Sequence, residues 1–191
     1  MRYADRMKKT CLLLSLLSLA LSVYAGPFGI SLDWTEEELY ASGAVITAVS
    51  DKDPSGTALY QLTPERPDPA FSHYAAEIND TFGLWRIIAL SDRYPDSKSI
   101  TGAFGELVSR ITEKYGEPMM ESDTFIKLSS PEIFARLALG ETYVVSILIP
   151  DPPVEDFTVL YLSVESDDGE TGYIHLECWS LYLSLLINSM S

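Results

Sequence analysis

The sequence predicts an α+β fold built on one antiparallel sheet of about seven to eight strands, with two to three helices. Short apolar-rich runs separated by turn-forming residues make up most of the chain, which is typical of antiparallel strands. One longer segment instead repeats its apolar residues at helical spacing. Strands and helices do not alternate strictly, so a doubly wound parallel sheet is disfavoured.

Residues 1–25 have the three parts of a secretory signal peptide. A basic start is followed by an apolar stretch, residues 11–21, and by the small-residue pattern 23–25. The stretch is shorter than the ~20 residues that a membrane-spanning helix needs, so an uncleaved anchor is the lesser alternative. Cys11 begins the stretch rather than closing it, which disfavours a lipoprotein. We expect an exported protein, periplasmic or extracellular, whose mature chain 26–191 forms a single globular domain.

The mature chain is expected to open with a strand and a short helix. Phe28, Ile30 and Leu32 recur at period two, which predicts a strand over residues 28–32. Thr35 then stands three residues before Glu38, as in a capping box, and predicts a helix over residues 36–42.

Four apolar-rich runs follow, and the segments between them are rich in Pro, Gly, Asp and Asn. Such separators are turn chemistry, so the block is predicted to be an antiparallel meander. Its strands are expected at residues 44–49, 57–62, 72–78 and 84–90.

Two further helices are predicted in the middle of the chain. Between Ser99 and Gly116 the apolar residues lie three or four positions apart, as on one face of an amphipathic helix. A shorter helix is indicated by Ser130 as its cap, Pro131 at its first position and Gly140 at its end.

The C-terminal part predicts three more strands, at residues 143–149, 157–164 and 173–179. The last two are joined through Asp168-Gly169, a pair that favours a hairpin turn. The apolar tail, residues 181–187, fits helix and strand equally and is expected to pack on the sheet.

The charge of the chain restricts its partners. The formal net charge is −15; without residues 1–25 there are 9 basic residues (13 minus 4) and 27 acidic residues (28 minus 1), a net of −18. Nucleic acid and anionic membrane surfaces are therefore disfavoured, and no stable membrane insertion is expected. The charge favours solubility, a partner protein with a basic surface, or divalent cations. The sequence carries no signal for the oligomeric state.

Cys178 is the cysteine that remains after residues 1–25 are removed, so no intramolecular disulfide is expected. It alternates with His175 and Glu177 and shares the period of Ile174 and Leu176. We therefore expect a buried, unreactive thiol in the core.

No motif assigns a catalytic, cofactor-binding or metal-binding residue. The two histidines, His73 and His175, lie in separate predicted strands, and neither has a second ligand at zinc-site spacing. The sequence contains neither a Gly-x-Ser-x-Gly element nor a glycine-rich phosphate loop. No cofactor and no metal are expected, although 27 acids leave room for paired carboxylates.

One partial metal motif has a simpler interpretation. Residues 51–56 match the first six positions of a calcium loop, with oxygen ligands at Asp51 and Asp53 and a glycine at Gly56. The twelfth position should be Glu and is Leu62, and the loop lies between two predicted strands. A hairpin turn is therefore favoured over a calcium site.

Two patches resemble small exported bacterial proteins without known activity. They are the opening Gly26-Pro27-Phe28-Gly29 with the acidic helix start after Trp34, and the helix end Lys114-Tyr115-Gly116-Glu117-Pro118. The resemblance implies a cell-envelope context and no site residues. The expected export, the negative charge and the lack of a catalytic motif favour a non-catalytic binding protein, for example of the inhibitor or immunity type. The alternative is a hydrolase of unrecognised type that uses carboxylates or a histidine.

Overall fold

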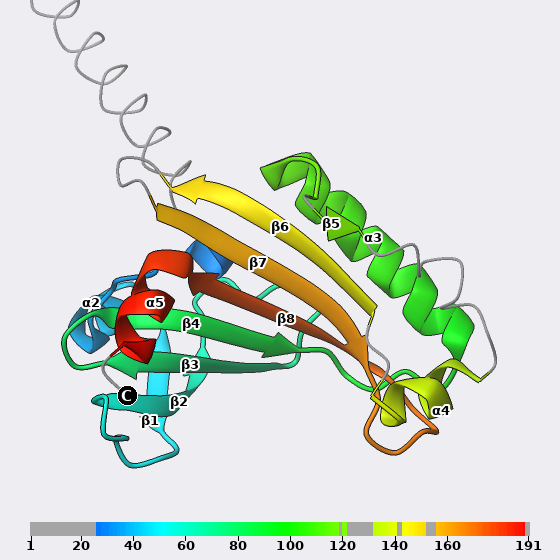
Figure 1. The fold of residues 1–191 in the computed structure, drawn as a ribbon, viewed down its shortest axis with the longest axis horizontal. Helices are drawn as coiled ribbons and strands as arrows, with labels where there is room; N and C mark the ends of the chain where they lie inside the picture. The colour runs from blue at the N-terminus through cyan, green and yellow to red at the C-terminus, as the bar shows by residue number, and fades with distance from the viewer. Residues whose placement is uncertain (1–25, 119, 122–131, 141–142, 152–155, 190–191) are drawn as a thin grey trace, which may run out of the picture.

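A computed structural model describes residues 26–118, 120–121, 132–140, 143–151 and 156–189. The predicted signal peptide, residues 1–25, lies outside the described residues. The described strands form one antiparallel sheet in the order β1-β2-β3-β4-β8-β7-β6-β5, accompanied by α-helices (Figure 1). This confirms the α+β class with an antiparallel sheet. The strands are β1 (Val45–Ala48), β2 (Thr57–Thr63), β3 (His73–Asn79), β4 (Gly83–Leu90), β5 (Met120–Glu121), β6 (Tyr143–Asp151), β7 (Asp156–Glu165) and β8 (Tyr173–Ser180).

Two antiparallel meanders join edge to edge in this sheet. Strands β1 to β4 pair in sequence order, which confirms the predicted four-stranded meander. Strands β6, β7 and β8 form the second meander, and β7 and β8 form the predicted hairpin. The two halves meet where β4 pairs with β8, with Ile87 opposite Cys178.

The opening of the mature chain is not a strand, contrary to the prediction for residues 28–32. Residues Pro27–Gly29 form a 3-10 turn, η1, in which Phe28 has a φ of 64°. Ile30 and Leu32 are buried, so the period of two predicted burial correctly. None of the described strands pairs with this segment along its length; backbone hydrogen bonds join Asp33 and Trp34 to Leu84 at the start of β4.

The described residues contain four α-helices, one more than the predicted maximum of three. Helix α2 (Glu36–Ala41) begins with the predicted capping box: Glu38 N–H donates to Thr35 Oγ1, and Thr35 N–H donates to Glu38 Oε2. Helix α3 (Ser97–Tyr115) is the predicted amphipathic helix. Helix α4 (Ile133–Ala138) lies before Gly140, whereas its predicted start at Ser130-Pro131 lies outside the described residues.

The additional helix is α5 (Leu181–Asn188), the tail whose period fitted helix and strand equally. The position of Ser180 favours the helix over a continuation of the strand. It ends β8 and its Oγ accepts a hydrogen bond from Leu183 N–H at 3.0 Å, which caps the first turn of the helix. Figure 1 shows α5 folding back along the sheet from the end of β8.

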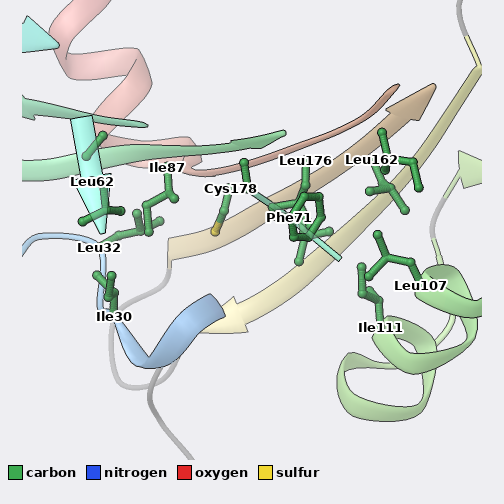
Figure 2. Close-up of a cluster of buried hydrophobic side chains, with 14 of the residues drawn as sticks. Ile30, Leu32, Leu62, Phe71, Ile87, Leu107, Ile111, Leu162, Leu176 and Cys178 are labelled. Carbon is green, nitrogen blue, oxygen red and sulfur yellow. The ribbon is translucent and has the colours of Figure 1, made fainter. Parts of the chain in front are cut away.

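The hydrophobic core lies on one face of the sheet, which we call the inner face, beneath α3, α4, α2 and the segment that contains Ile30 and Leu32. Leu107 and Ile111 of α3 approach Leu162 and Leu176 of the sheet (Figure 2). Cys178 lies on the same face and is fully buried, as predicted.

We expect the Cys178 thiol to stay unlabelled by a thiol reagent in the native protein and to react on denaturation. The side chain is 0% exposed, so the reagent has no access until the sheet opens. The measurement is labelling with a chromogenic disulfide reagent over time, with Cys178→Ser giving the background. Labelling within seconds under native conditions would contradict the packing described here.

Candidate functional site

The face of the sheet opposite α3, which we call the outer face, carries most of the polar side chains of the central strands. On β8 the buried residues alternate with half-buried ones, so Tyr173, His175, Glu177 and Trp179 point away from the core. The register places Ser163 of β7 beside His175 on this face. Both the outer face and its neighbouring helix α5 are therefore candidates for function.

Five charged side chains form a chain of contacts across the outer face, which we call the ion network. His175 Nδ1 lies 2.7 Å from Glu165 Oε1, and its Nε2 lies 3.2 Å from Glu177 Oε1. Arg86 holds both oxygens of Glu177, with Nη2 donating to Oε1 at 2.6 Å and Nε donating to Oε2 at 3.2 Å. Arg86 Nη1 also donates to Glu77 Oε1 at 3.2 Å. The network thus links β7, β8, β4 and β3.

Two hydroxyl groups complete the bonding of Glu165. Ser163 Oγ donates to Oε1 at 2.9 Å, and Tyr173 OH donates to Oε2 at 3.1 Å. Side chains of the ion network are between 16% and 31% exposed. The network is therefore half-buried, and its charges interact more strongly than they would in bulk water.

The ion network controls the protonation of its own members. Burial alone would lower the pKa of His175, but the contacts with Glu165 and Glu177 outweigh it and raise this pKa to about 9. Burial would likewise raise the pKa of Glu177, and His175 and Arg86 instead lower it to about 2. The contact with His175 is the main cause of a lowered pKa at Glu165. At neutral pH His175 is an imidazolium flanked by two carboxylates.

An imidazolium has no lone pair, so His175 in this state neither accepts a proton nor binds a metal. Ser163 is the nearest hydroxyl for a hydrolytic role, but it is 0% exposed and donates to Glu165 rather than to a histidine. A nucleophilic serine needs a general base that can take its proton, and access to substrate. The ion network is therefore a structural cluster of two cations and three carboxylates that links four strands.

The second histidine does not join this network. His73 begins β3 on the outer face and is exposed. The register places Leu90 between His73 and His175, one strand from each. Within the described ranges, no three His, Cys, Asp or Glu side chains converge in a group that could hold a metal ion. The expectation that the protein needs no metal stays a prediction.

The calcium-loop motif forms the turn between β1 and β2. Asp53 Oδ1 accepts hydrogen bonds from the backbone N–H of Ser55 and of Thr57, both at 2.9 Å. The hydroxyl of Ser55 is the main cause of a lowered pKa at Asp53. Gly56 has a φ of 82°, which closes the turn. The hairpin interpretation is confirmed; weak or absent calcium binding remains a prediction.

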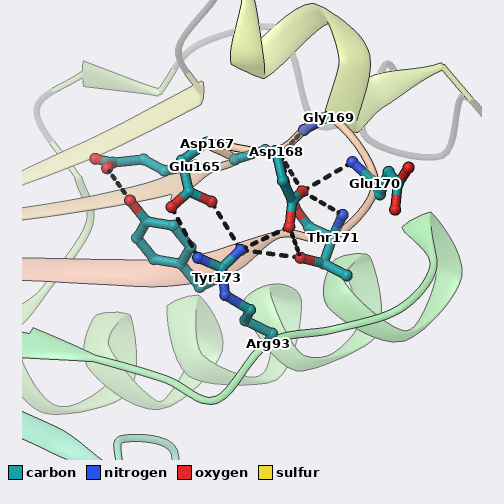
Figure 3. A network of polar contacts seen from close by, with 9 residues as sticks. Arg93, Glu165, Asp167, Asp168, Gly169, Glu170, Thr171 and Tyr173 are labelled. Carbon is teal, nitrogen blue, oxygen red and sulfur yellow. Dashed lines mark hydrogen bonds and ion pairs between the residues drawn. The ribbon is translucent and has the colours of Figure 1, made fainter.

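A second polar cluster locks the loop between β7 and β8 (Figure 3). Arg93, which follows β4, donates to both oxygens of Asp167 at 2.7 and 2.8 Å and to Asp168 Oδ2 at 3.0 Å. Asp168 Oδ1 accepts from the backbone N–H of Glu170 and Thr171, and contacts with Thr171 are the main cause of its lowered pKa. The loop is thereby held beside Tyr173 and the end of the ion network.

Helix α5 leaves much of its apolar surface exposed to solvent. All of its residues except Ser184 and Asn188 are apolar, yet Ile187 is the one that is buried. Its side chains at Leu181, Tyr182 and Leu185 are 39%, 55% and 64% exposed; we call these three the α5 surface. A helix that is apolar all round normally lies inside a protein or against a partner.

The C-terminal end of α5 lies close to Glu77, one member of the ion network. Ile187 at the end of α5 borders a recess of about 290 Å³ that is also lined by Glu77 and Trp85. Asp51 and Asp53 line the same recess, whereas no Lys or Arg is among its described lining residues. The C-terminal end of α5 thus borders a recess that is lined by three carboxylates. None of the described helices is long and apolar enough to cross a membrane.

No protein-family model, no curated protein and no solved structure matches this chain.

Few of these residues could be identified from the sequence, although local patterns pointed to some of them. Alternation along β8 already placed His175 and Glu177 together on the polar face. Their partner Arg86 lies 91 residues away from Glu177, and only the pairing of β4 with β8 brings the two together. For α5, Ser180 before a run of apolar residues was a usable helix-start signal.

Proposed function

We propose that this chain is a non-catalytic binding protein of the cell envelope that recognises a partner protein through the α5 surface. The observation that carries the proposal is the exposure of Leu181, Tyr182 and Leu185 on a helix that is otherwise apolar. Removing such a surface from water on binding is favourable, and apolar side chains on a rigid element are typical anchors of an interface.

The negative charge at the C-terminal end of α5 supports a partner with a basic contact surface. Asp51, Asp53 and Glu77 border the recess at the end of α5, and the whole chain has a net charge of −15. A second copy of the chain would bring the same negative charge to the interface and be repelled. A partner with lysine or arginine around an apolar centre matches both features.

Binding is favoured over hydrolysis because the groups of the ion network contact one another or are buried. His175 Nε2 is buried and makes an ion-pair contact with Glu177 at 3.2 Å without a hydrogen bond. Both ring nitrogens of His175 contact carboxylates, and the neighbouring Ser163 is buried. Neither group is free to act on a substrate. The network instead holds the strands beneath α5 in one register, which suits a surface that must stay rigid.

The experiment is cross-linking of the protein in the envelope of its native host, followed by identification of the cross-linked partner. We expect Leu185→Ser to weaken the recovered complex about tenfold, because loss of a central apolar anchor typically costs about 1–2 kcal/mol. Leu139→Ser is the matched control, since Leu139 is 86% exposed and lies after α4, away from α5.

The purified complex then gives a kinetic check of charge complementarity. Raising salt from low to physiological should slow association severalfold and change dissociation less. A complex that Leu185→Ser leaves unchanged, a partner that is acidic at the contact, or a homodimer as the cross-linked species would refute the proposal.

A further inference from the structure

A second pocket, unrelated to the α5 surface, opens at the inner face of the sheet. It has a volume of about 430 Å³ and lies between η1, the loop after β2, and α3. Its apolar wall includes Phe71, Leu107, Ile111 and Leu176 (Figure 2). Pockets of ~300–1,000 Å³ with apolar walls are typical of small-molecule sites.

The rim of this pocket is basic, although the protein is strongly acidic. Arg66, Arg110 and Lys114 line it, which is three of the nine Lys and Arg residues that follow residue 25. Asp68 is the one carboxylate among the described lining residues, so their charge is three positive against one negative. The local charge has the opposite sign to that of the whole chain.

Two of the three cations are not committed to strong ion pairs. Asp68 Oδ1 engages Arg110 Nη2 at 3.1 Å. Arg66 lies 3.9 Å from Glu65 with both side chains mostly exposed, a contact that contributes little. Among the described residues Lys114 contacts no carboxylate, and its Nζ lies 4.6 Å from the centroid of the Tyr115 ring.

Lys114 and Arg110 stand four residues apart in α3, one turn of helix, and therefore project from the same face. Leu107 and Ile111 on the adjoining rows of that helix are buried and form part of the apolar wall. One face of α3 thus supplies both an apolar surface and two cations at the pocket. A ligand lying along it would meet the apolar wall at one end and positive charge at the other.

We propose that this pocket binds a small amphipathic carboxylate, with its apolar part against Phe71 and Leu176 and its carboxylate at Lys114 and Arg66. A neutral amphiphile would leave the cations without a partner, and a cationic one would be repelled by them. The site is independent of partner binding at the α5 surface, so either proposal can fail without the other.

The test is calorimetric titration of the purified protein with three probes that share one chain length. The probes are octanoate, 1-octanol and octyltrimethylammonium, each below its aggregation concentration. We expect octanoate to bind at least about tenfold more tightly than either of the others, because it alone satisfies both the wall and the rim.

Two exposed lysines of α3 supply the matched variants. Lys114→Gln should weaken octanoate binding about fivefold and leave 1-octanol unchanged, and adding Arg66→Gln should weaken octanoate further. Lys98→Gln removes the same charge from the first turn of α3, outside the pocket, and should have no effect. All variants are checked for an unchanged melting temperature.

Three results would overturn the proposal. The first is no octanoate binding up to about 10 mM, the weak limit of specific small-ligand affinity. The second is equal affinity for octanoate and 1-octanol. The third is an equal loss of octanoate binding in Lys114→Gln and Lys98→Gln, which would make the effect one of overall charge.

Discussion

Replacing Glu177 with glutamine should lower the free energy of unfolding by about 3 kcal/mol at pH 6, the typical cost of removing one partner from a buried ion pair. Glu177 lies between two cations, with Arg86 on both of its oxygens and His175 at 3.2 Å. A neutral glutamine leaves these two cations facing each other in a half-buried site. Urea unfolding measures the change.

Glu170→Gln is the matched control for this variant. Glu170 lies in the exposed loop between β7 and β8, and it loses the same charge without disturbing the ion network. We expect its unfolding free energy to stay within about 0.5 kcal/mol of the wild type. Equal destabilisation by the two substitutions would show that the network contributes nothing specific.

The ion network also predicts how stability depends on pH. His175 has a pKa of about 9 in the folded protein against an ordinary value of 6.5, so its stabilisation is complete below pH 6.5 and is lost as the pH rises to 9. Glu177 has a pKa of about 2 against an ordinary 4.5, so its contribution is complete above pH 4.5 and is lost as the pH falls to 2.

The network therefore stabilises the fold most between about pH 4.5 and 6.5. From pH 6.5 to 9 we expect the wild type to lose up to roughly 3 kcal/mol more than His175→Gln, which has no group to titrate there. Parallel stability curves for the two proteins over this range would contradict the raised pKa of His175.

Gly83→Ala is expected to destabilise the protein by about 3 kcal/mol or more, through backbone strain and a clash together. Gly83 has a φ of 74°, a left-handed conformation that alanine adopts only with strain. A Cβ at this position would lie 2.3 Å from the carbonyl oxygen of Asp33 and 2.8 Å from that of Trp34. These are backbone atoms and cannot rotate away.

The clash would displace the segment that leads into α2. Asp33 N–H donates to Leu84 O at 2.7 Å, and Leu84 N–H donates to Trp34 O at 2.8 Å, so the two hydrogen bonds hold the segment at the start of β4. Moving it would also withdraw Ile30 and Leu32 from the core. We expect urea unfolding to show the loss of stability. We expect faster proteolysis near residue 30 to show that the N-terminal segment is displaced.

Gly116→Ala separates strain from clash. Gly116 has a φ of 99°, and a Cβ at this position would have no described atom within 4 Å beyond its adjoining residues, so alanine meets only backbone strain there. We expect it to cost roughly 1–2 kcal/mol, clearly less than Gly83→Ala. If the two substitutions lower the free energy of unfolding equally, the N-terminal segment can move away from the new Cβ at residue 83 without loss of stability.

Local sequence signals predicted most elements of this fold because each signal acts over a few residues. Turn chemistry separated the strands of the first meander, and the period of α3 was readable from its buried residues alone. The same logic failed at residues 28–32, where the alternation of Ile30 and Leu32 was real but no strand was there to pair with it. Alternation reports which side chains are buried and does not report backbone hydrogen bonding.

For the candidate sites, too, some features could be predicted from the sequence and others could not. Composition gives the sign of the net charge, and alternation separated His175 and Glu177 from Cys178. The sequence could not predict the pocket beneath α3, because Phe71, Leu107 and Leu176 come from three distant segments.

By itself, the sequence determined which side chains of the strands and of α3 face the core, where the chain turns and what sign its charge has. Alternation, turn chemistry and composition can be read without knowing which distant segments meet. The tertiary structure alone decided that Arg86 meets Glu177 and that α5 remains exposed after folding. Both depend on the register between β4 and β8 and on how one helix packs on a completed sheet. The free energy that selects such an arrangement is summed over contacts between distant segments, and no local pattern encodes it.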